Sequence, residues 1–438
     1  MRRLAVVGLL ALAFPSAAWA HAALLHTSPK VEQRLSASPR MVTLEFDQSV
    51  RVLPNGIRVV DAKGALVSGP PHQRAGDPRV VEAPLTRMPR GGYTVRWATI
   101  SNDGHVGRGV FTFGVRAPAP AIGEAFGASG PTTAEHVVRW LYFLCLALLT
   151  GGLGFRLVVL RGPLSEAAER RFYRMTGIGV VAALQIGIVA FLLRAEDALQ
   201  LPFTAFLYGD LSPFAKATRL GQAFVAMELG FALVAALLFL AWLTERRVLL
   251  WPAFLLSLGL GSGLSLASHQ GGDRGWLPSF ADWVHLSAAS LWIGGLLSLG
   301  LVVWNDRELR RTAFWRFSEL AGPLVALVVA AGVYMSFKRF PALHDLWDVG
   351  YGQLLLVKLG LVSLALSWGA FHHFVVRPRL DRPDVQRRLS RSLVGEATVA
   401  VSILLLAAIL VDSKPPARPS NTVSQGAGSA VPSAFGGK

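Results

Sequence analysis

The sequence predicts two domains of different class: a small all-β sandwich or barrel at residues 21–117, followed by an all-α membrane bundle of eight helices at residues 134–412. In the first part, apolar residues alternate with polar ones, and Pro or Gly interrupts them roughly every ten residues, which is typical of short strands and turns. In the second part, eight apolar stretches each approach the roughly 20 residues that cross a bilayer as a helix. Because 52% of the 438 residues are hydrophobic, most of the chain must lie in lipid.

Residues 1–20 have the features of a secretory signal peptide. Two arginines precede an apolar run at Leu4–Phe14, and the stretch ends in the small-residue pattern Ala-Trp-Ala. The apolar run is too short to span a bilayer. Cleavage after Ala20 would make His21 the first residue of the mature chain, so that its free amine and its imidazole would lie side by side as potential metal ligands.

The exported domain carries a second set of potential ligands. Alternation is clearest at Val42–Phe46 and at Tyr93–Trp97, and the second of these stretches leads into Asp103 and His105. These two residues are two positions apart, so on an extended backbone both side chains point to one face, and Gly104 between them permits close approach. Imidazole and carboxylate together are ligands suited to a transition metal.

Composition separates the remaining segments. Residues 118–133 are rich in Ala, Pro and Gly and are expected to form a flexible linker. Residues 413–438, rich in Ser, Pro and Gly, are expected to form a disordered tail. The lone Cys145 lies in an apolar segment, so the exported domain has neither a disulfide nor a thiolate metal site. The eight expected membrane helices lie at about 134–160, 172–193, 220–244, 248–267, 281–304, 319–337, 352–376 and 393–411.

The formal net charge of +16 is explained by membrane topology. No basic run is interleaved with stacking aromatic residues, which argues against a nucleic-acid partner. Sixteen arginines lie in the loops that follow odd-numbered helices, and only six arginines and lysines lie in the opposite loops. The positive-inside rule therefore places the first set of loops in the cytoplasm, and the N-terminal domain and the tail on the outer side of the membrane.

A second candidate metal site lies where the fourth and fifth membrane segments meet the outer face. His269 follows the fourth segment, and Asp282 and His285 begin the fifth. On a helix, Asp282 and His285 fall on the same stripe as Ala289 and Trp292, with the two polar residues at the outer end. We expect His269, Asp282 and His285 to form a metal site there. The alternative is a loop with two ordinary interfacial histidines.

Other polar groups are costly inside the membrane segments and are expected to face the bundle interior. They are His136, Glu228, Lys358 and Glu396. Glu228 and Lys358 lie at similar depths, about 9 to 12 Å from the outer ends of their helices, so they are candidates for an ion pair. Glu396, with His372 and His373, lies near the cytoplasmic face and marks either an inner exit or interfacial packing.

The first domain resembles the periplasmic copper-binding family CopC. The resemblance rests on HAALLHTSPK at residues 21–30, VTLEFDQSV at residues 42–50 and GGYTVRWATISNDGHVGRGVFTFGV at residues 91–115. It implies an immunoglobulin-like β-sandwich in which Cu(II) is bound by the amine and imidazole of His21 and by Asp103 and His105. The domain has only two methionines, which argues against a methionine-rich Cu(I) site.

The second domain resembles the copper-resistance membrane family CopD. The resemblance rests on four motifs in order: SHQGG at residues 268–272, ADWVHLSAASLWIGG at residues 281–295, YGQLLLVK at residues 351–358 and RSLVGE at residues 391–396. It implies movement of copper into or across the inner membrane. Copper and the lipid bilayer are then the expected partners; the oxidation state of copper in this half and the oligomeric state stay open.

Together the two resemblances imply a copper-homeostasis protein of the inner membrane, which captures Cu(II) in the periplasm and passes copper to the membrane half for import. We expect no catalytic residues and no enzyme activity. The sequence has neither a P-loop nor an aspartyl-phosphate motif, so transport would run on gradients. One alternative is a copper buffer, sensor or resistance protein without transport. Another is a b-type haem redox protein, because transmembrane histidines can be axial ligands, although haem usually takes paired histidines deep in facing helices.

Overall fold

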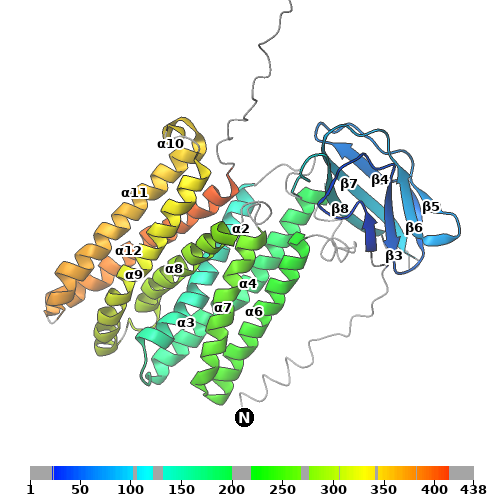
Figure 1. Ribbon diagram of the computed structural model, residues 1–438. Helices are drawn as coiled ribbons and strands as arrows, with labels where there is room; N and C mark the ends of the chain where they lie inside the picture. Colours follow the sequence, from blue (N-terminus) through cyan, green and yellow to red (C-terminus); the bar gives the residue numbers. More distant parts are fainter. Residues whose placement is uncertain are drawn as a thin grey trace, which may run out of the picture.

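The structure is a computed structural model of the full chain, with a β domain and a helical bundle (Figure 1). It describes residue 22 and residues 24–101, 106–121, 132–199, 219–267, 276–304, 306–340, 344–380 and 382–413. The expected signal peptide and most of the expected tail lie outside the described residues. So do four of the expected metal ligands, which are His21, Asp103, His105 and His269.

The β domain consists of two four-stranded sheets, ordered β1-β3-β6-β5 and β2-β8-β7-β4. Its strands are β1 Leu24–Ser28, β2 Gln33–Leu35, β3 Met41–Phe46, β4 Val50–Asp61, β5 His72–Arg74, β6 Asp77–Pro84, β7 Gly91–Ser101 and β8 Val106–Val115. The expected all-β domain is therefore confirmed as a sandwich of two sheets.

Alternation places the core between the sheets. Leu44 and Phe46 of β3 and Val95 and Trp97 of β7 are buried, and the rings of Phe46 and Trp97 meet edge to face with centroids 5.5 Å apart. Aromatic pairs in this geometry stabilise a core beyond the area that they bury. The contact joins the end of β3 in one sheet to β7 in the other.

The second half of the described chain is helical throughout its apolar segments. Its elements are α2 Thr133–Leu146, η2 Ala147–Gly151, α3 Gly152–Gly154, η3 Phe155–Val159, α4 Glu166–Leu199, α6 Arg219–Thr244, η5 Arg247–Leu249, α7 Leu250–Ala267, α8 Trp276–Leu301, α9 Arg307–Arg339, α10 Asp345–Asp348, α11 Gly350–Phe371, η6 His372–Val376, η7 Arg377–Arg379 and α12 Pro383–Asp412. All eight expected segments are confirmed as helical. Among the described residues, seven spans are long and apolar enough to cross a membrane, and the eighth, in α7, is a shorter apolar helix.

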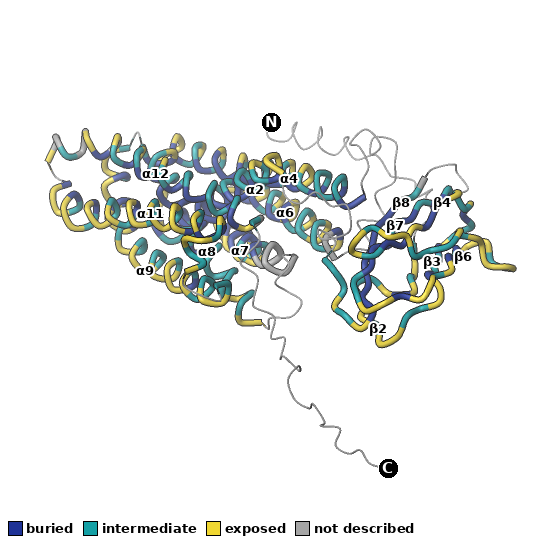
Figure 2. The backbone as a smooth tube through the Cα atoms, turned by 90° about the horizontal axis from the view of Figure 1, so that it is seen from above, coloured by how far each residue is buried: buried dark blue, intermediate teal, exposed yellow. Residues whose placement is uncertain are grey.

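The helices alternate in direction, so the bundle has two ends. We call proximal the end at which α2, α6, α8 and α11 begin, and distal the opposite end. Most residues of the α2 segment are buried, whereas α9 and α11 are mainly intermediate or exposed (Figure 2). The exposed residues of α9 and α11 include the large apolar residues Leu327, Phe337, Val357 and Leu359. An apolar surface of this kind suits lipid rather than water, and the chain is accordingly a multi-pass membrane protein.

A close helix crossing joins the α2 segment to α8 through two glycines. A Cβ atom built on Gly294 would lie 2.6 Å from the Cα of Gly151, and it would also collide with the carbonyl oxygen of Ala147. Small residues at such a crossing let two backbones approach closely within a membrane. This contact fixes α8, and with it the expected metal ligands Asp282 and His285, against the middle of the bundle.

We predict that Gly294→Ala destabilises the bundle by about 1–3 kcal/mol, because the added methyl group would force the two backbones apart. Gly300→Ala in the same helix is the matched control, since its Cβ would meet no atom within 4 Å and alanine favours the helix. Melting temperatures of both variants in detergent check the prediction. An equal shift for the two alanines would contradict it.

The β domain contacts the proximal end of the bundle through the last turn of α4. Arg96 of β7 donates from Nε to the carbonyl oxygen of Ala198 over 3.2 Å, and it also interacts with Asp197. The last carbonyls of a helix lack partners within the helix and carry partial negative charge, so a guanidinium suits this position. Burial and the nearby charge of Arg58 lower the pKa of Arg96, and Asp197 opposes this change.

The start of α2 is tied to the same end of α4. Thr132 and Glu135 form a capping box in which each side chain accepts from the other residue's backbone N–H. Arg194 of α4 bridges to Glu135 with an N–O distance of 3.3 Å. The point at which the chain enters the bundle is therefore held beside the helix that contacts the β domain.

Candidate functional site

Strand pairing brings the strand ends that lead to the expected exported metal site to one end of the sandwich. Leu24, at the start of β1, pairs with Phe46 at the end of β3. Ser101, at the end of β7, pairs with Val50 at the start of β4, which follows β3 after a short turn. His21 precedes β1, and Asp103 and His105 fall between β7 and β8. These three residues lie outside the described part of the chain, but the strands that lead to them converge.

The expected membrane site also includes a residue outside the described part of the chain. His269 lies outside the described residues, whereas Asp282 and His285 lie on α8, one turn apart, in its proximal half. His285 is nine residues from the start of α8, which places it roughly 14 Å along the helix axis. No group of three or more potential metal ligands of the His, Cys, Asp or Glu type is found within the described residues alone. The set of three that the sequence predicts therefore depends on His269.

His285 is held by a hydrogen bond that fixes its tautomer. Its Nδ1 lies 2.8 Å from the carbonyl oxygen of Val328 on α9. Because a carbonyl can only accept, Nδ1 must donate, and in the neutral ring the lone pair is then on Nε2. Metal-binding histidines usually donate their second ring nitrogen to a carbonyl or carboxylate in this way. The half-buried ring thus presents the nitrogen that could bind a metal.

Gly332, one turn from Val328 on α9, leaves room for this ring. A Cβ atom at Gly332 would lie 3.2 Å from Cε1 of His285, which is closer than side chains normally pack. A larger residue would push the imidazole away from the Val328 carbonyl. Sequence reasoning missed both Val328 and Gly332, because a backbone carbonyl can belong to any residue and a membrane helix contains many glycines.

Lys358 lies near this site, and the ion pair expected between it and Glu228 is wrong. The charges that act on Lys358 are those of Arg339 and Asp282, and Lys358 in turn acts on His285. No ion pair joins Lys358 to Glu228, although both residues belong to the described part of the chain. Lys358 therefore lies within electrostatic reach of Asp282. Arg339 also donates from Nη1 to the hydroxyl of Tyr351 over 2.8 Å.

Glu228 lies in a different part of the bundle. Its carboxylate packs against Gly187 of α4, so tightly that a Cβ at Gly187 would collide with it. It also acts electrostatically on Tyr142 of α2, whose ring meets Phe231 edge to face at 6.0 Å. Glu228 is thus enclosed by α2, α4 and α6. His136 lies in the first turn of α2 at the proximal end, half-buried.

Glu396 and His372 form a buried pair in the distal half. His372 Nδ1 lies 2.7 Å from Glu396 Oε2, and His372 Nε2 lies 2.7 Å from the hydroxyl of Ser392. The two residues come from η6 and α12 and are almost fully buried. The sequence left an inner exit and interfacial packing open, and a buried histidine bonded at both ring nitrogens fits either of them.

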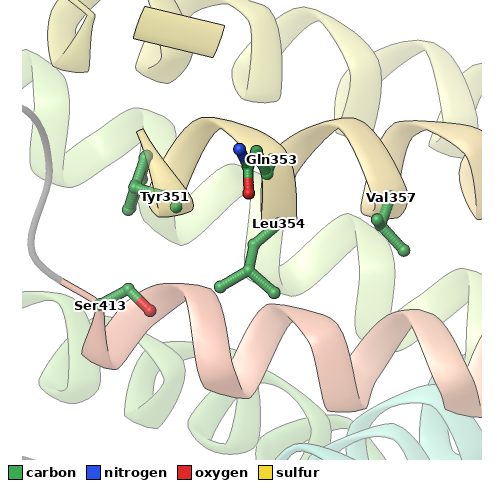
Figure 3. Close-up of a pocket in the computed structure, with 6 residues that line it drawn as sticks. Tyr351, Gln353, Leu354, Val357 and Ser413 are labelled. Carbon is green, nitrogen blue, oxygen red and sulfur yellow. The ribbon is translucent and has the colours of Figure 1, made fainter. Parts of the chain in front are cut away.

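An open cavity of about 710 Å³ lies between the start of α11 and the end of α12 (Figure 3). Tyr351, Gln353, Leu354 and Val357 of α11 line one side, and Ser413 lines the other. None of Asp282, His285 and Lys358 lines it, so this cavity is separate from the expected metal site.

Three family models match this chain in succession. The CopC domain matches residues 24–116, the N-terminal domain of copper resistance protein D-like proteins matches residues 131–279, and copper resistance protein D matches residues 311–410. The chain therefore joins a CopC domain to a membrane domain of the copper resistance protein D type. The β domain is the part that matches CopC, and the helical bundle is the part that matches the two copper resistance protein D models.

Relatives agree with this assignment over different lengths. Copper transport protein CutJ of Bacillus subtilis (strain 168) is 26% identical over 95% of this chain and 78% of its own length. Copper resistance protein D of Pseudomonas syringae pv. tomato is 26% identical over 63% of this chain and 92% of its own length. Protein YobA of Escherichia coli (strain K12) is 33% identical over 22% of this chain and 81% of its own length.

A solved structure also resembles the β domain. It is the crystal structure of CopC from Methylosinus trichosporium OB3b, 30% identical, which covers 22% of this chain and 95% of that chain with a TM-score of 0.21. The two relatives that cover most of this chain are thus called a copper transport protein and a copper resistance protein.

Proposed function

We propose that this chain captures Cu(II) in the periplasm with its β domain and passes copper to the membrane domain for import across the inner membrane. The capture site consists of the amine and imidazole of His21 together with Asp103 and His105. The acceptor site in the membrane consists of His269, Asp282 and His285. The proximal end of the bundle then faces the periplasm, in agreement with the distribution of arginines between the loops.

The observation that carries this proposal is the orientation of His285. Its Nδ1 is committed to the Val328 carbonyl, so Nε2 is the nitrogen available to a metal. Imidazole with a carboxylate is a donor set that copper accepts. Asp282, one turn closer to the proximal end, supplies that carboxylate. Lys358 on α11 interacts electrostatically with both Asp282 and His285.

Two further features support transfer from one domain to the other. The strands that lead to His21, Asp103 and His105 converge at one end of the sandwich. The hydrogen bond from Arg96 to the Ala198 carbonyl ties the β domain to the proximal end of the bundle, where Asp282 and His285 also lie. The donor and the acceptor are therefore on the same side of the membrane.

Vesicles that contain the purified chain and an enclosed copper indicator test the proposal. We expect external Cu(II) to raise the indicator signal well above that of protein-free vesicles. A chelator that removes external copper is the control. If the indicator does not respond, although the protein binds copper, transport is excluded, and a copper buffer or sensor becomes the better description of the protein.

A further inference from the structure

A polar site that the copper relay does not use lies in the distal half of the membrane domain. His372 is at the junction of α11 and η6, and Glu396 and Ser392 lie one turn apart on α12. His372 is 4% exposed and Glu396 is 3% exposed. The site is thus cut off from solvent, and it lies at the opposite end of the bundle from His285.

The hydrogen bonds of this site allow for one additional proton. Trp368 Nε1 can only donate, so Ser392 Oγ accepts from it over 2.8 Å. When His372 is neutral, its Nδ1 donates to ionised Glu396, and the Ser392 hydroxyl donates to Nε2. When Nε2 binds a proton, it donates to Ser392 Oγ instead, and the hydroxyl hydrogen rotates away. Both states keep the same heavy-atom positions, so a proton can bind and leave without rearrangement of the helices.

Neighbouring aromatic residues close the site. The ring of Phe314 on α9 meets His372 edge to face with centroids 5.8 Å apart. A Cβ atom at Gly395 would lie 2.5 Å from Trp368 Cη2, so α11 and α12 are packed without space at this level. In such a low-dielectric setting a hydrogen bond to a charged group is strong, and an unpaired charge is costly. The protonation state of His372 is therefore linked to that of Glu396.

Other polar side chains lie on η6, η7 and α9, towards the distal end of the bundle. His373, next in the chain, has Nδ1 2.8 Å from the hydroxyl of Ser318 on α9. The adjacent Glu319 is mostly exposed and pairs with Arg377 of η7 over 2.5 Å. Arg316 of α9 and Arg388 and Arg391 of α12 are further charged residues on the elements that pack around the pair. His373 and Glu319 are the members of this distal set that can accept a proton.

The energetics do not favour a purely structural role for this pair. Two ionisable groups lose their hydration when they are buried, and well-packed apolar residues of the same size often stabilise a protein as much or more. Ionisable groups within membrane spans usually have a function for this reason. His372 also opens a short π-helical stretch, His372–Val376, and such stretches are frequent at functional sites.

We propose that His372 and Glu396 form the proton-binding site that couples copper movement to the proton gradient. This proposal rests on the proposed transport of copper. For each copper ion that passes, one proton binds at Nε2 of His372 from one side of the membrane and leaves to the other side. No electron is transferred and no covalent bond other than N–H is formed or broken.

Copper-indicator vesicles with an imposed pH difference test this coupling. If one proton moves per copper ion, each unit of pH difference across the membrane should change the final copper accumulation about tenfold. Whether accumulation rises or falls shows in which direction the proton moves relative to copper. For the variants Glu396→Gln and His372→Gln, we expect the final copper accumulation to change less than about twofold per pH unit. Glu319→Gln is the matched control, because it removes an exposed carboxylate at the same end of the bundle, and it should respond as the wild type does.

The outcomes separate the coupling from the copper relay. A wild type that transports copper without any response to the pH difference, or a Glu396→Gln variant with the full response, overturns the coupling and leaves the relay standing. Ser392→Ala removes only the hydroxyl and provides a milder variant should the others fold poorly; it should weaken the response. Copper transport that persists unchanged in a His285 variant overturns the relay instead.

A measurement without copper tests the proton site directly. In isotope-labelled protein titrated from alkaline to acidic pH, nuclear magnetic resonance of the histidine rings should show one buried ring that gains a second proton. This change should disappear in His372→Gln and shift in Glu396→Gln. A His372 ring whose protonation stays constant over this range would overturn the proposal even if copper transport itself fails.

Discussion

Replacing His285 by alanine is expected to reduce copper uptake to the level of protein-free vesicles. The substitution removes the imidazole whose Nε2 is presented by the Val328 carbonyl, and it leaves Asp282 with no imidazole partner on α8. Cu(II) binding by the β domain should be unchanged, because that domain has its own core and its own ligands. Copper uptake into indicator vesicles and Cu(II) titration of the same protein measure the two properties together.

The corresponding variant of the capture site should behave differently. With His105→Ala, uptake should fall at low external copper and recover at high external copper, because concentration can replace a lost capture site but not a lost relay site. His285→Ala should show no such recovery. Normal transport by His285→Ala would mean that the membrane domain is an anchor or uses another route, and the relay would be abandoned.

Extending the mature N-terminus by one alanine is expected to weaken Cu(II) binding more than about 100-fold. The extra residue converts the amine of His21 into a peptide nitrogen and moves the new amine away from the imidazole. Competition with a chelator of known affinity measures the loss. A cleavable extension is the matched control, since its removal should restore the original affinity. Unchanged affinity in the extended protein would show that the amine is not a ligand.

Periodicity and hydropathy predicted most of the fold, because buried positions are occupied by apolar residues that recur with the period of the strand or helix. Val42, Leu44 and Phe46 alternate with polar residues, and the structure buries all three in the β3 face of the sandwich. Apolar length alone located all eight helices. The ends of the helices were predicted less accurately than their apolar centres. The helix α9 begins at Arg307, twelve residues before its expected start, because its first turns are charged and lie beyond the apolar span.

Pairing within the bundle was not predictable in the same way. Glu228 and Lys358 lie at similar depths, which suggested an ion pair, but depth says nothing about which helices are neighbours. Glu228 turned out to be enclosed by α2, α4 and α6, whereas Lys358 lies near Asp282. The Val328 carbonyl that orients His285 could not be predicted from the sequence, because every residue has a backbone carbonyl. Ser392 could have been found, since it lies one helical turn from Glu396.

The length of α4 has a consequence for the chemistry of transfer. Its 34 residues extend about 50 Å, whereas the hydrocarbon core of a bilayer is about 30 Å thick. Its final turn can therefore stand clear of the lipid and hold the β domain there through Arg96. In the proposed transfer, a donor fixed in this way would meet its acceptor at an effective concentration of about the millimolar range, whatever the amount of free copper outside. The same domain supplied as a separate protein would have to reach that concentration to deliver copper equally fast.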